Sequence, residues 1–195
     1  MKNIFLSASI PSPERHPKYY ESADIIAIRE AIIALTTIAL PHHRIIWGGH
    51  PSITPLIYFV MEKMGLQNKI QEHVTLYQSE YFKDKFPVDN NKFENLILTK
   101  NLGDIPSSIQ HMRIRMFTEN KFNAAIFIGG MDGIEVEYKM FKEYHPEALI
   151  LPIASTGAAT KIIYDNLLPD EQKNESFLKD YGYMSLFQKF LIDKI

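Results

Sequence analysis

Four runs of small and hydroxyl residues, each directly after an apolar stretch, are the first candidates for chemistry in this chain. They are Ser7-Ala8-Ser9, Gly48-Gly49-His50, Gly129-Gly130-Met131-Asp132-Gly133 and Ala154-Ser155-Thr156-Gly157. Small residues let backbone N–H groups approach a ligand, and a helix that begins just behind them favours an anion. Glycine in such a place also makes ordinary turns, but four runs of this kind favour a phosphate-binding site over that alternative.

A glutamate follows the third run at a useful spacing. Glu137 lies four residues after Gly133, which puts it one turn into an expected helix. A carboxylate there faces the positive helix end and can accept hydrogen bonds from ribose hydroxyls. In an N-glycosidase it would stabilise oxocarbenium charge or position water. The alternative is an acid that only stabilises the first turn, and Asp132 and Glu135 are weaker candidates for the same role.

Two arginines lie on the helix expected at residues 105–122. Arg113 and Arg115 both fall off its apolar stripe, and Arg115 is the candidate for ligand binding. A guanidinium can form a fork of hydrogen bonds on a phosphate or a ribose, which a lysine cannot. The alternative is that both arginines are simply solvated.

Other polar and aromatic residues stand near these runs. His50 either contacts a ligand or serves as a structural hydrogen-bonding group. Arg15 and His16, in the loop after the first run, either close on a ligand or belong to a charged surface loop. Three aromatic residues could stack on a base or pack in the core or a lid: Tyr77, Tyr81 and Phe82. His42-His43 have no histidine at helical spacing and no nearby acid, so we expect no metal site.

Short apolar runs alternate with longer segments of helical periodicity. The expected strands are 3–7, 44–47, 73–77, 95–99, 124–128 and 148–153. The expected helices are 23–40, 54–64, 105–122, 134–144, 155–168 and 183–194. Apolar strands that alternate with helices of ten or more residues predict an α/β fold. We expect a doubly wound, mainly parallel, Rossmann-like sheet with helices on both faces.

In such sheets, ligands bind at the carboxyl ends of the strands, near the switch in strand order, where the four runs are expected to lie. Two common phosphate-binding fingerprints are missing, however. No G-x-G-x-x-G follows the first strand and no G-x-x-x-x-G-K-[ST] occurs in the chain. A redox Rossmann enzyme and a P-loop nucleotide hydrolase are therefore both disfavoured.

Three segments, in order, resemble the Lonely Guy and DprA-related superfamily known as SLOG domains. They are Ile4-Phe5-Leu6-Ser7-Ala8-Ser9, Ile46-Trp47-Gly48-Gly49, and Met112-Arg113-Ile114-Arg115-Met116 followed by the segment from Ile128 to Glu137. Lonely Guy proteins carry a Met-x-x-Arg-Lys helix and then a Pro-Gly-Gly-x-Gly-Thr-x-x-Glu turn. The resemblance covers most of residues 3–168.

Within this resemblance, Arg115 and Glu137 match the arginine and glutamate with which Lonely Guy enzymes cleave an N-glycosidic bond. The chain departs from the pattern elsewhere: Ile128 replaces the Pro, Asp132 is an added residue, Ile134 replaces the Thr and Met116 replaces the Lys. The lost Thr hydroxyl helps to hold phosphate in those enzymes. The chain is therefore more similar to SLOG domains that sense nucleotide-derived ligands in bacterial defence.

The resemblance implies a standalone domain that binds a nucleotide or NAD-derived molecule and requires no cofactor. The residues expected to bind it are Ser7, Ala8, Gly48, Gly49, His50, Arg115, Gly129, Gly130, Asp132, Gly133, Glu137, Ser155, Thr156 and Gly157. The alternative is an N-glycosidase, either a phosphoribohydrolase or a deoxyribosyltransferase-like enzyme, in which Arg115 and Glu137 are catalytic. Nucleic-acid binding of the DprA kind is disfavoured by the net charge of −2 and by the lack of a basic stripe.

Composition sets the wider limits. The 195 residues suit one domain, which we place at 1–168, followed by a helical extension at 169–195 packed on it. The absence of cysteine excludes disulfides, cysteine zinc sites and a thiol nucleophile. The apolar stretch 25–40 contains Arg29 and Glu30 and is too short to span a bilayer, and residues 1–15 do not resemble a signal peptide. We expect a soluble cytoplasmic protein with no membrane partner.

The helix expected at residues 23–40 is apolar over well over half its circumference. A helix on one sheet face needs an apolar stripe of only ~100°, so the surplus must pack on something else. The C-terminal segment 183–195 is similarly apolar and could cover the helix within one chain. The alternative is a twofold interface, towards which the SLOG resemblance also points, and we expect a homodimer.

Overall fold

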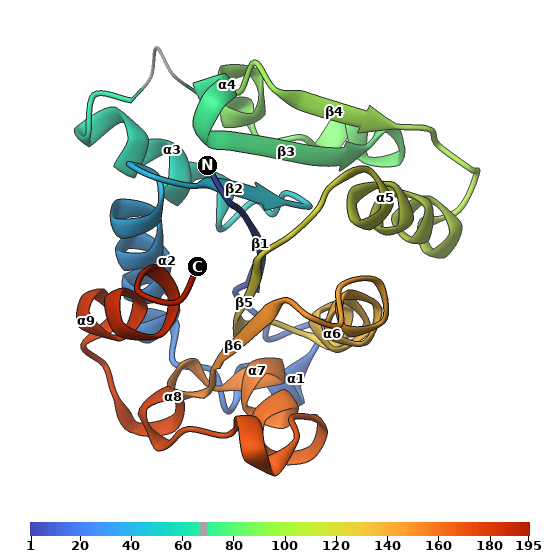
Figure 1. Ribbon diagram of the computed structural model, residues 1–195. Coiled ribbons are helices and arrows are strands. Elements are labelled where there is room, and N and C mark those ends of the chain that lie inside the picture. Colours follow the sequence, from blue (N-terminus) through green and yellow to red (C-terminus); the bar gives the residue numbers. More distant parts are fainter. Residues whose placement is uncertain (67–69) are drawn as a thin grey trace.

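The computed structural model describes residues 1–66 and 70–195. The described residues form a central sheet of six parallel strands with helices around it (Figure 1). The strands are β1 (Asn3–Ser9), β2 (Arg44–Trp47), β3 (Val74–Ser79), β4 (Leu96–Thr99), β5 (Ala124–Gly129) and β6 (Leu149–Ile153). Their order in the sheet is β4-β3-β2-β1-β5-β6, and each neighbouring pair is parallel. The predicted doubly wound α/β fold is confirmed.

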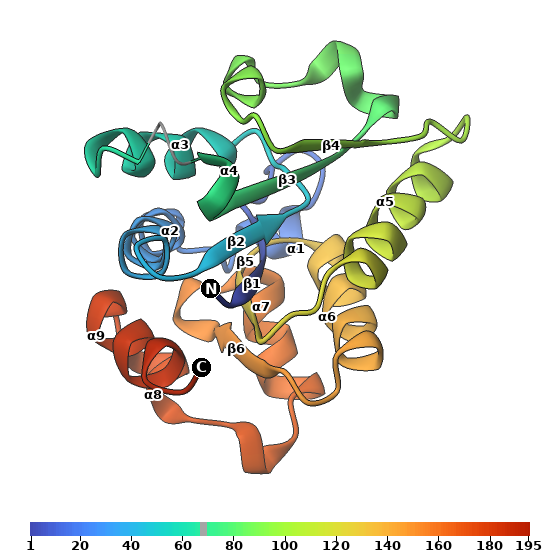
Figure 2. The same cartoon turned by 45° about the horizontal axis from the view of Figure 1, so that its top comes forward.

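Helices lie on both faces of this sheet (Figure 2). They are α1 (Pro17–Tyr20), α2 (Ile25–Ala39), α3 (Thr54–Lys63), α4 (Ile70–His73), α5 (Ile105–Glu119), α6 (Asp132–Tyr144), α7 (Ala158–Ile162), α8 (Glu175–Lys179) and α9 (Tyr183–Phe187). Helices α2, α3 and α9 cover one face, and α5 and α6 cover the other. None of the described helices is long and apolar enough to cross a membrane.

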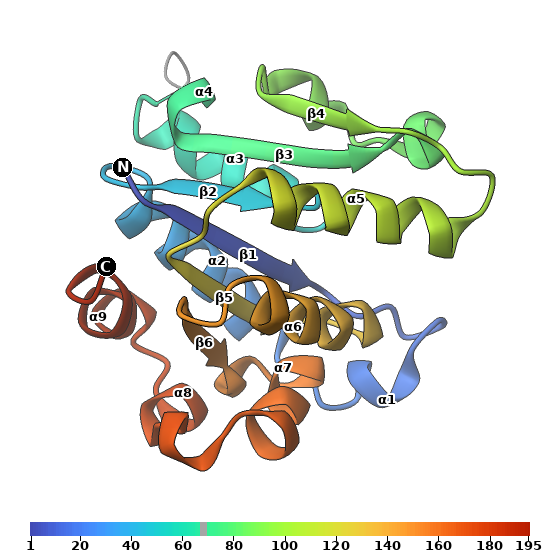
Figure 3. The same ribbon diagram turned by 45° about the vertical axis from the view of Figure 1, so that its right-hand side comes forward.

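The strand order reverses beside β1. The chain moves from β1 outward through β2, β3 and β4, and then returns through α5 to β5 on the other side of β1. Figure 3 shows α5 and α6 lying side by side across this central part of the sheet. The crevice expected for a ligand in such a fold therefore lies at the carboxyl ends of the strands near β1.

A group of phenylalanines fixes α5 and α6 against the centre of the sheet. Phe5 of β1 stacks on Phe141 of α6, with ring centroids 5.5 Å apart, and meets Phe117 of α5 edge to face at 4.9 Å. All three side chains are buried. Aromatic pairs in these geometries stabilise packing beyond the area that they bury. The two helices that carry the candidate arginine and glutamate thus have fixed positions on β1.

The C-terminal segment packs against α2 within the chain. Leu186 and Phe187 of α9, and Leu191 in the following π-helical turn η7 (Gln188–Ile192), are buried in the same core as the strands. The C-terminal segment of the same chain therefore covers most of the surplus apolar surface of α2. This is the intrachain alternative to the dimer that the sequence predicted. Ile26 of α2 stays 75% exposed and Phe59 of α3 stays 48% exposed.

Several boundaries differ from the prediction because local hydrogen bonds set them. Helix α2 begins at Ile25, two residues later than predicted, because the Asp24 side chain accepts from the Ala27 N–H at 2.9 Å and caps the helix there. Strand β3 continues to Ser79, two residues beyond its predicted end. Two 3₁₀ turns follow it, η2 (Glu80–Lys85) and η3 (Val88–Lys92), between the predicted strands 73–77 and 95–99, where no helix or strand was predicted.

Candidate functional site

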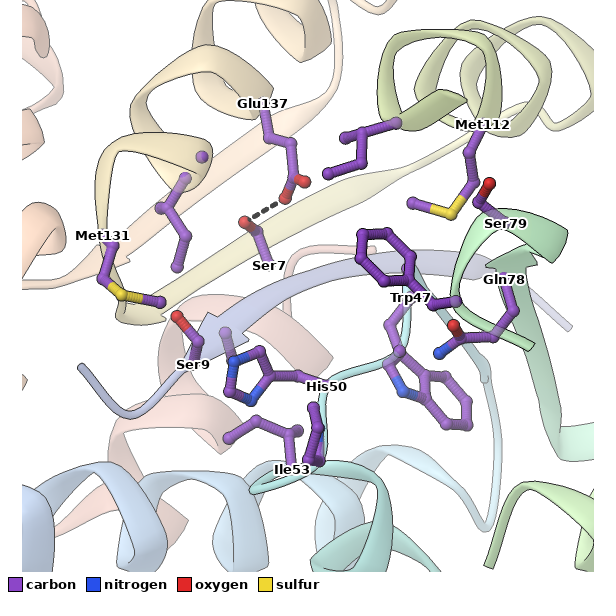
Figure 4. Close-up of a pocket in the computed structure, with 18 of the residues that line it drawn as sticks. Ser7, Ser9, Trp47, His50, Ile53, Gln78, Ser79, Met112, Met131 and Glu137 are labelled. Atoms are coloured by element: carbon purple, nitrogen blue, oxygen red, sulfur yellow. Dashed lines mark hydrogen bonds between the residues drawn. The ribbon is translucent and has the colours of Figure 1, made fainter. Parts of the chain in front are cut away.

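A cavity of about 760 Å³ opens at the carboxyl ends of β1, β2 and β3, beside the N-terminal parts of α5 and α6 (Figure 4). Its size is typical of sites for small organic ligands. The lining includes Ser7, Ala8, Ser9, Arg15, Gly48, Gly49, His50, Gln78, Ser79, Phe82, Lys85, Phe86, Met112, Arg113, Met131, Gly133 and Glu137. The cavity lies where the topology of the sheet places a ligand site.

Three polar side chains meet at the wall formed by β1, α5 and α6. The Ser7 hydroxyl donates to Glu137 Oε2 at 2.5 Å, and Arg113 Nε donates to Glu137 Oε1 at 3.0 Å. Arg113 and Glu137 form an ion pair whose side chains are only 13% and 16% exposed. Both oxygens of the Glu137 carboxylate therefore accept hydrogen bonds from the protein itself.

Gly133 makes room for this arrangement at the start of α6. Arg113 Nη2 donates to the Gly133 carbonyl at 3.2 Å. A Cβ at position 133 would lie 2.9 Å from Arg113 Nη2, closer than real Cβ contacts come. The absence of a side chain thus lets the guanidinium reach both the first turn of α6 and Glu137 in its second turn.

His50 presents a neutral ring to the cavity. Its Nδ1 lies 2.7 Å from Ser52 Oγ and accepts from the Ser52 N–H at 3.3 Å. The Ile10 N–H donates to the same Ser52 hydroxyl at 3.3 Å, which links this loop to the end of β1. Burial, and then the charge of Arg15, lower the pKa of His50 to about 4. Because Nδ1 accepts, the proton of the neutral ring is on Nε2, which can donate to a ligand.

Basic side chains outnumber acidic ones around the cavity. Arg15, Lys85 and Arg113 line it, against Glu137 as the acid. Glu137 is already paired with Arg113, so Arg15 and Lys85 are left at the rim. The whole chain has a net charge of −2, and the positive excess is therefore a local property of this cavity. Such a lining attracts an anion.

The structure corrects the choice of arginine. Arg115 is absent from the cavity lining, and its Nε donates instead to Glu119 Oε1 at 2.6 Å along the outer side of α5. Residues two positions apart on a helix point ~200° away from each other. Since Arg113 faces the cavity beside the buried Met112, Arg115 faces away from it.

The glycine pair at the end of β5, Gly129 and Gly130, makes a turn and does not line the cavity. The Gly129 N–H donates to Thr156 Oγ1 and the Gly130 N–H to the Ser9 carbonyl, each at 2.9 Å. Both glycines have positive φ, and a Cβ at Gly130 would lie 1.9 Å from the Ile134 side chain. Because these amides are used within the protein, the phosphate cradle expected here is absent. Asp132 is also outside the lining, and its Oδ1 lies 3.9 Å from His16 Nε2.

The fourth run, after β6, also lies outside the cavity lining. Ser155 Oγ donates to the Asp180 carbonyl at 3.2 Å and contacts the Tyr183 hydroxyl at 3.0 Å. Thr156 Oγ1 donates to the Ile153 carbonyl at 2.5 Å, and a Cβ at Gly157 would lie 1.8 Å from the Ser22 carbonyl oxygen. These residues join the C-terminal segment and the loop before α2 to the sheet, and they do not line the cavity in which they were expected to bind the ligand.

The structure adds residues that the sequence did not single out. Gln78, at the end of β3, and Phe86, Met112 and Met131 line the cavity. Gln78 could have been found from its position at the carboxyl end of β3, as the four runs were found at other strand ends. It was missed because this strand was predicted to end at Tyr77. Among the aromatic candidates, Phe82 lines the cavity and Tyr77 is buried in the core. In the described ranges 1–66 and 70–195, no three His, Asp or Glu side chains gather to hold a metal ion.

Comparison with known proteins places the chain in a family. The sequence model of the SLOG cluster3 family matches residues 18–191. A search of curated proteins finds no match to the chain. The matched range includes β2 to β6 and both cavity helices, and it begins after β1. A match over so much of the chain agrees with the resemblance seen in its strand ends, and the chain belongs to the SLOG cluster3 family.

Proposed function

We propose that this chain binds a nucleotide or a NAD-derived small molecule in the cavity at the carboxyl ends of β1, β2 and β3. The observation that carries the proposal is the local excess of basic side chains, because Glu137 is neutralised by Arg113 while Arg15 and Lys85 remain. A ligand with one or more phosphates suits this charge. Membership of a family of Rossmann-like SLOG domains supports the same ligand class.

The two ends of the cavity differ in character, which suits a ligand with a charged end and a flat ring. Ser9, His50 and Met131 lie toward one end, and Gln78, Trp47 and Met112 lie toward the other (Figure 4). At the first end, the N-cap residue of α6, Met131, makes no side-chain cap, so the positive helix terminus is open to a phosphate. Ser7 and Glu137 lie between the two ends, within reach of a ribose.

Calorimetric titration tests the proposal. We expect saturable binding of at least one of ADP-ribose, its cyclic forms, NAD and the common mononucleotides. The variant Lys85→Gln should weaken that binding by about two- to fivefold, as loss of a rim charge does. Lys83→Gln is the matched control, since Lys83 is exposed and outside the lining. No binding of any of these ligands at millimolar concentration would contradict the proposal.

The N-glycosidase alternative uses the same residues. Glu137 beside Ser7 is placed where a carboxylate could act on a ribose. However, both carboxylate oxygens are engaged by Ser7 and Arg113, which supports a positioning role. Chromatography of AMP incubated with the protein separates the two functions, and our proposal expects no release of adenine. Release that Glu137→Gln abolishes while AMP still binds would make the chain an enzyme.

The homodimer expected from the sequence is a separate proposal. Its remaining support is the set of exposed apolar side chains on the α2, α3 and α9 side of the sheet, Ile26, Phe59 and Met184. Scattered exposed apolar side chains also occur on monomeric proteins. The ligand proposal is independent of the dimer, because the cavity is lined by residues of one chain.

A further inference from the structure

The carboxamide of Gln78 faces the cavity and has no hydrogen-bond partner within the described residues. Gln78 is 7% exposed and lines the cavity from the end of β3 (Figure 4). Its backbone carbonyl accepts from Thr99 Oγ1 at 3.4 Å, but its side chain forms no hydrogen bond within residues 1–66 and 70–195. Most of the Gln78 side chain is enclosed by protein while its carboxamide is open to the cavity, so a ligand in the cavity is placed to supply the missing hydrogen bonds.

The neighbouring residues hold this carboxamide against the wall without pairing with it. A Cβ at Gly49 would lie 1.6 Å from Gln78 Nε2 and 2.7 Å from Cδ, so only glycine leaves room for the amide. The nearby indole of Trp47 is already engaged, since its Nε1 donates to Thr54 Oγ1 at 3.2 Å. The Gln78 carboxamide therefore keeps both its acceptor and its donors for a ligand.

The surroundings of Gln78 suit a flat ring. Trp47 and Met112 lie toward the same end of the cavity as Gln78, and Phe82 and Phe86 also line the cavity. Aromatic and thioether groups stack well on heterocycles. A carboxamide reads an edge on which a donor and an acceptor are adjacent, as a glutamine does with the amino group and ring nitrogen of adenine.

We propose that Gln78 is the residue that selects the ligand's base, and that the base is adenine. The Gln78 carbonyl accepts from the 6-amino group, and its NH₂ group donates to the adjacent ring nitrogen. This inference rests on the proposed function, because it assigns one end of the same cavity to the base of the nucleotide.

The test compares two ligands that differ only in the 6-amino group, AMP and purine riboside 5′-monophosphate. Calorimetry on the full chain should give an affinity for AMP about tenfold or more above that for the purine compound. Gln78→Met keeps the length of the side chain and removes both hydrogen bonds, so the ratio should fall to about one. Gln110→Met is the matched control, because Gln110 is an exposed glutamine on α5 outside the lining, and it should keep the ratio of the unmodified protein.

Each outcome decides the inference. An unchanged preference for AMP in Gln78→Met overturns the role of Gln78 and leaves nucleotide binding intact. Failure of AMP and the purine compound to bind the unmodified protein, while another of the titrated nucleotides binds, overturns this inference alone. Failure of all of them overturns the proposed function as well. A melting curve checks that each variant folds. If Gln78→Met does not fold, Gln78→Glu takes its place, because it keeps the shape, loses the donor and should lower the ratio in the same direction.

Discussion

Arg113 and Arg115 differ in what they contact, although they are two positions apart on α5. Arg113 pairs with Glu137 in the cavity wall, and Arg115 pairs with Glu119 on the outer side of the helix. Arg113→Gln should weaken nucleotide binding by at least about tenfold, because it leaves the Glu137 carboxylate in the cavity wall without its counter-ion, where it would repel an anionic ligand. Titration calorimetry with the best-binding nucleotide measures this loss.

Arg115→Gln is the matched variant for that measurement. It removes an i,i+4 pair whose side chains are 34% and 39% exposed, so its effect on binding and on stability should be small. Equal losses of affinity in the two variants would show that the guanidinium facing the cavity has no special role. A loss of affinity in Arg115→Gln but not in Arg113→Gln would show that Arg115 binds the ligand, as the sequence pattern predicted.

His50 makes the stability of the fold depend on pH. Burial and the charge of Arg15 lower its pKa from 6.5 to about 4, so the folded protein holds the ring neutral. Below pH 6.5 the His50 ring of the unfolded chain binds a proton that the folded protein does not bind. The contribution of His50 to the free energy of unfolding is therefore fully present above pH 6.5. It is lost as pH falls towards 4, by up to about 3 kcal/mol.

The replacement His50→Gln should therefore reduce the fall in unfolding free energy between pH 7 and pH 4.5. Urea denaturation at several pH values measures the difference from the unmodified protein. Burial also lowers the pKa values of His43 and His145. Both proteins contain these two residues, so their contributions cancel in the difference between the unfolding free energies at the same pH. Identical slopes in the two proteins would contradict the assignment of this pH dependence to His50.

At the residue scale, the sequence predicted the types of side chain in the cavity better than their positions. Ser7, His50 and Glu137 follow from spacing after strand ends, and the structure places all three in the lining. The choice between the arginines depends on the rotational phase of α5, which its contacts with the core set through the buried Met112 and Met116. Spacing within the motif does not contain that information.

At the scale of elements, the glycine turns separate into those that shape the cavity and those that join the sheet to its surroundings. Gly157 lies between β6 and α7 with φ +71° and ψ −152°, a conformation nearly restricted to glycine. Gly157→Ala should lower the unfolding free energy by more than about 2 kcal/mol, because its Cβ would overlap the Ser22 carbonyl. Affinity for the nucleotide, measured where the variant is folded, should stay unchanged.

Gly65 provides the control for backbone strain without steric overlap. It also has a positive φ, +68°, but a Cβ there would meet nothing within 4 Å. Gly65→Ala should therefore cost about 1 kcal/mol, the strain of the left-handed conformation alone. Urea unfolding of both variants measures the contrast. A loss of ligand affinity in folded Gly157→Ala would return the fourth run to the binding site.

Elements made of a continuous apolar run or of several helical turns were predictable from sequence, and isolated short helices were not. Strand β2 and the ends of α6 and β6 lie at the predicted residues, because continuous apolar runs and helical periodicity extend over their whole length. The short helices α1 and α8 fall outside the individual helices that were predicted, since four or five residues carry little periodic signal. The same weakness hid the end of β3, and with it Gln78.

At the scale of the whole molecule, the oligomeric state remains a prediction from sequence. Helix α9 covers much of the apolar surface of α2, while Ile26, Phe59 and Met184 stay exposed. We expect light scattering at micromolar protein to give twice the chain mass of 22.5 kDa. A mass of one chain that does not change with concentration would contradict the dimer, and the cavity would keep its lining in a monomer.

The proposed nucleotide site lies at the switch in strand order, between the strand ends and the starts of α5 and α6. A crystal structure of the chain grown with millimolar ADP-ribose measures this most directly. We predict density in the cavity, with a phosphate beside His50 and the start of α6, and with the adenine ring against Gln78. Density for the nucleotide on another surface, or a cavity without it while calorimetry reports binding, would contradict the claim.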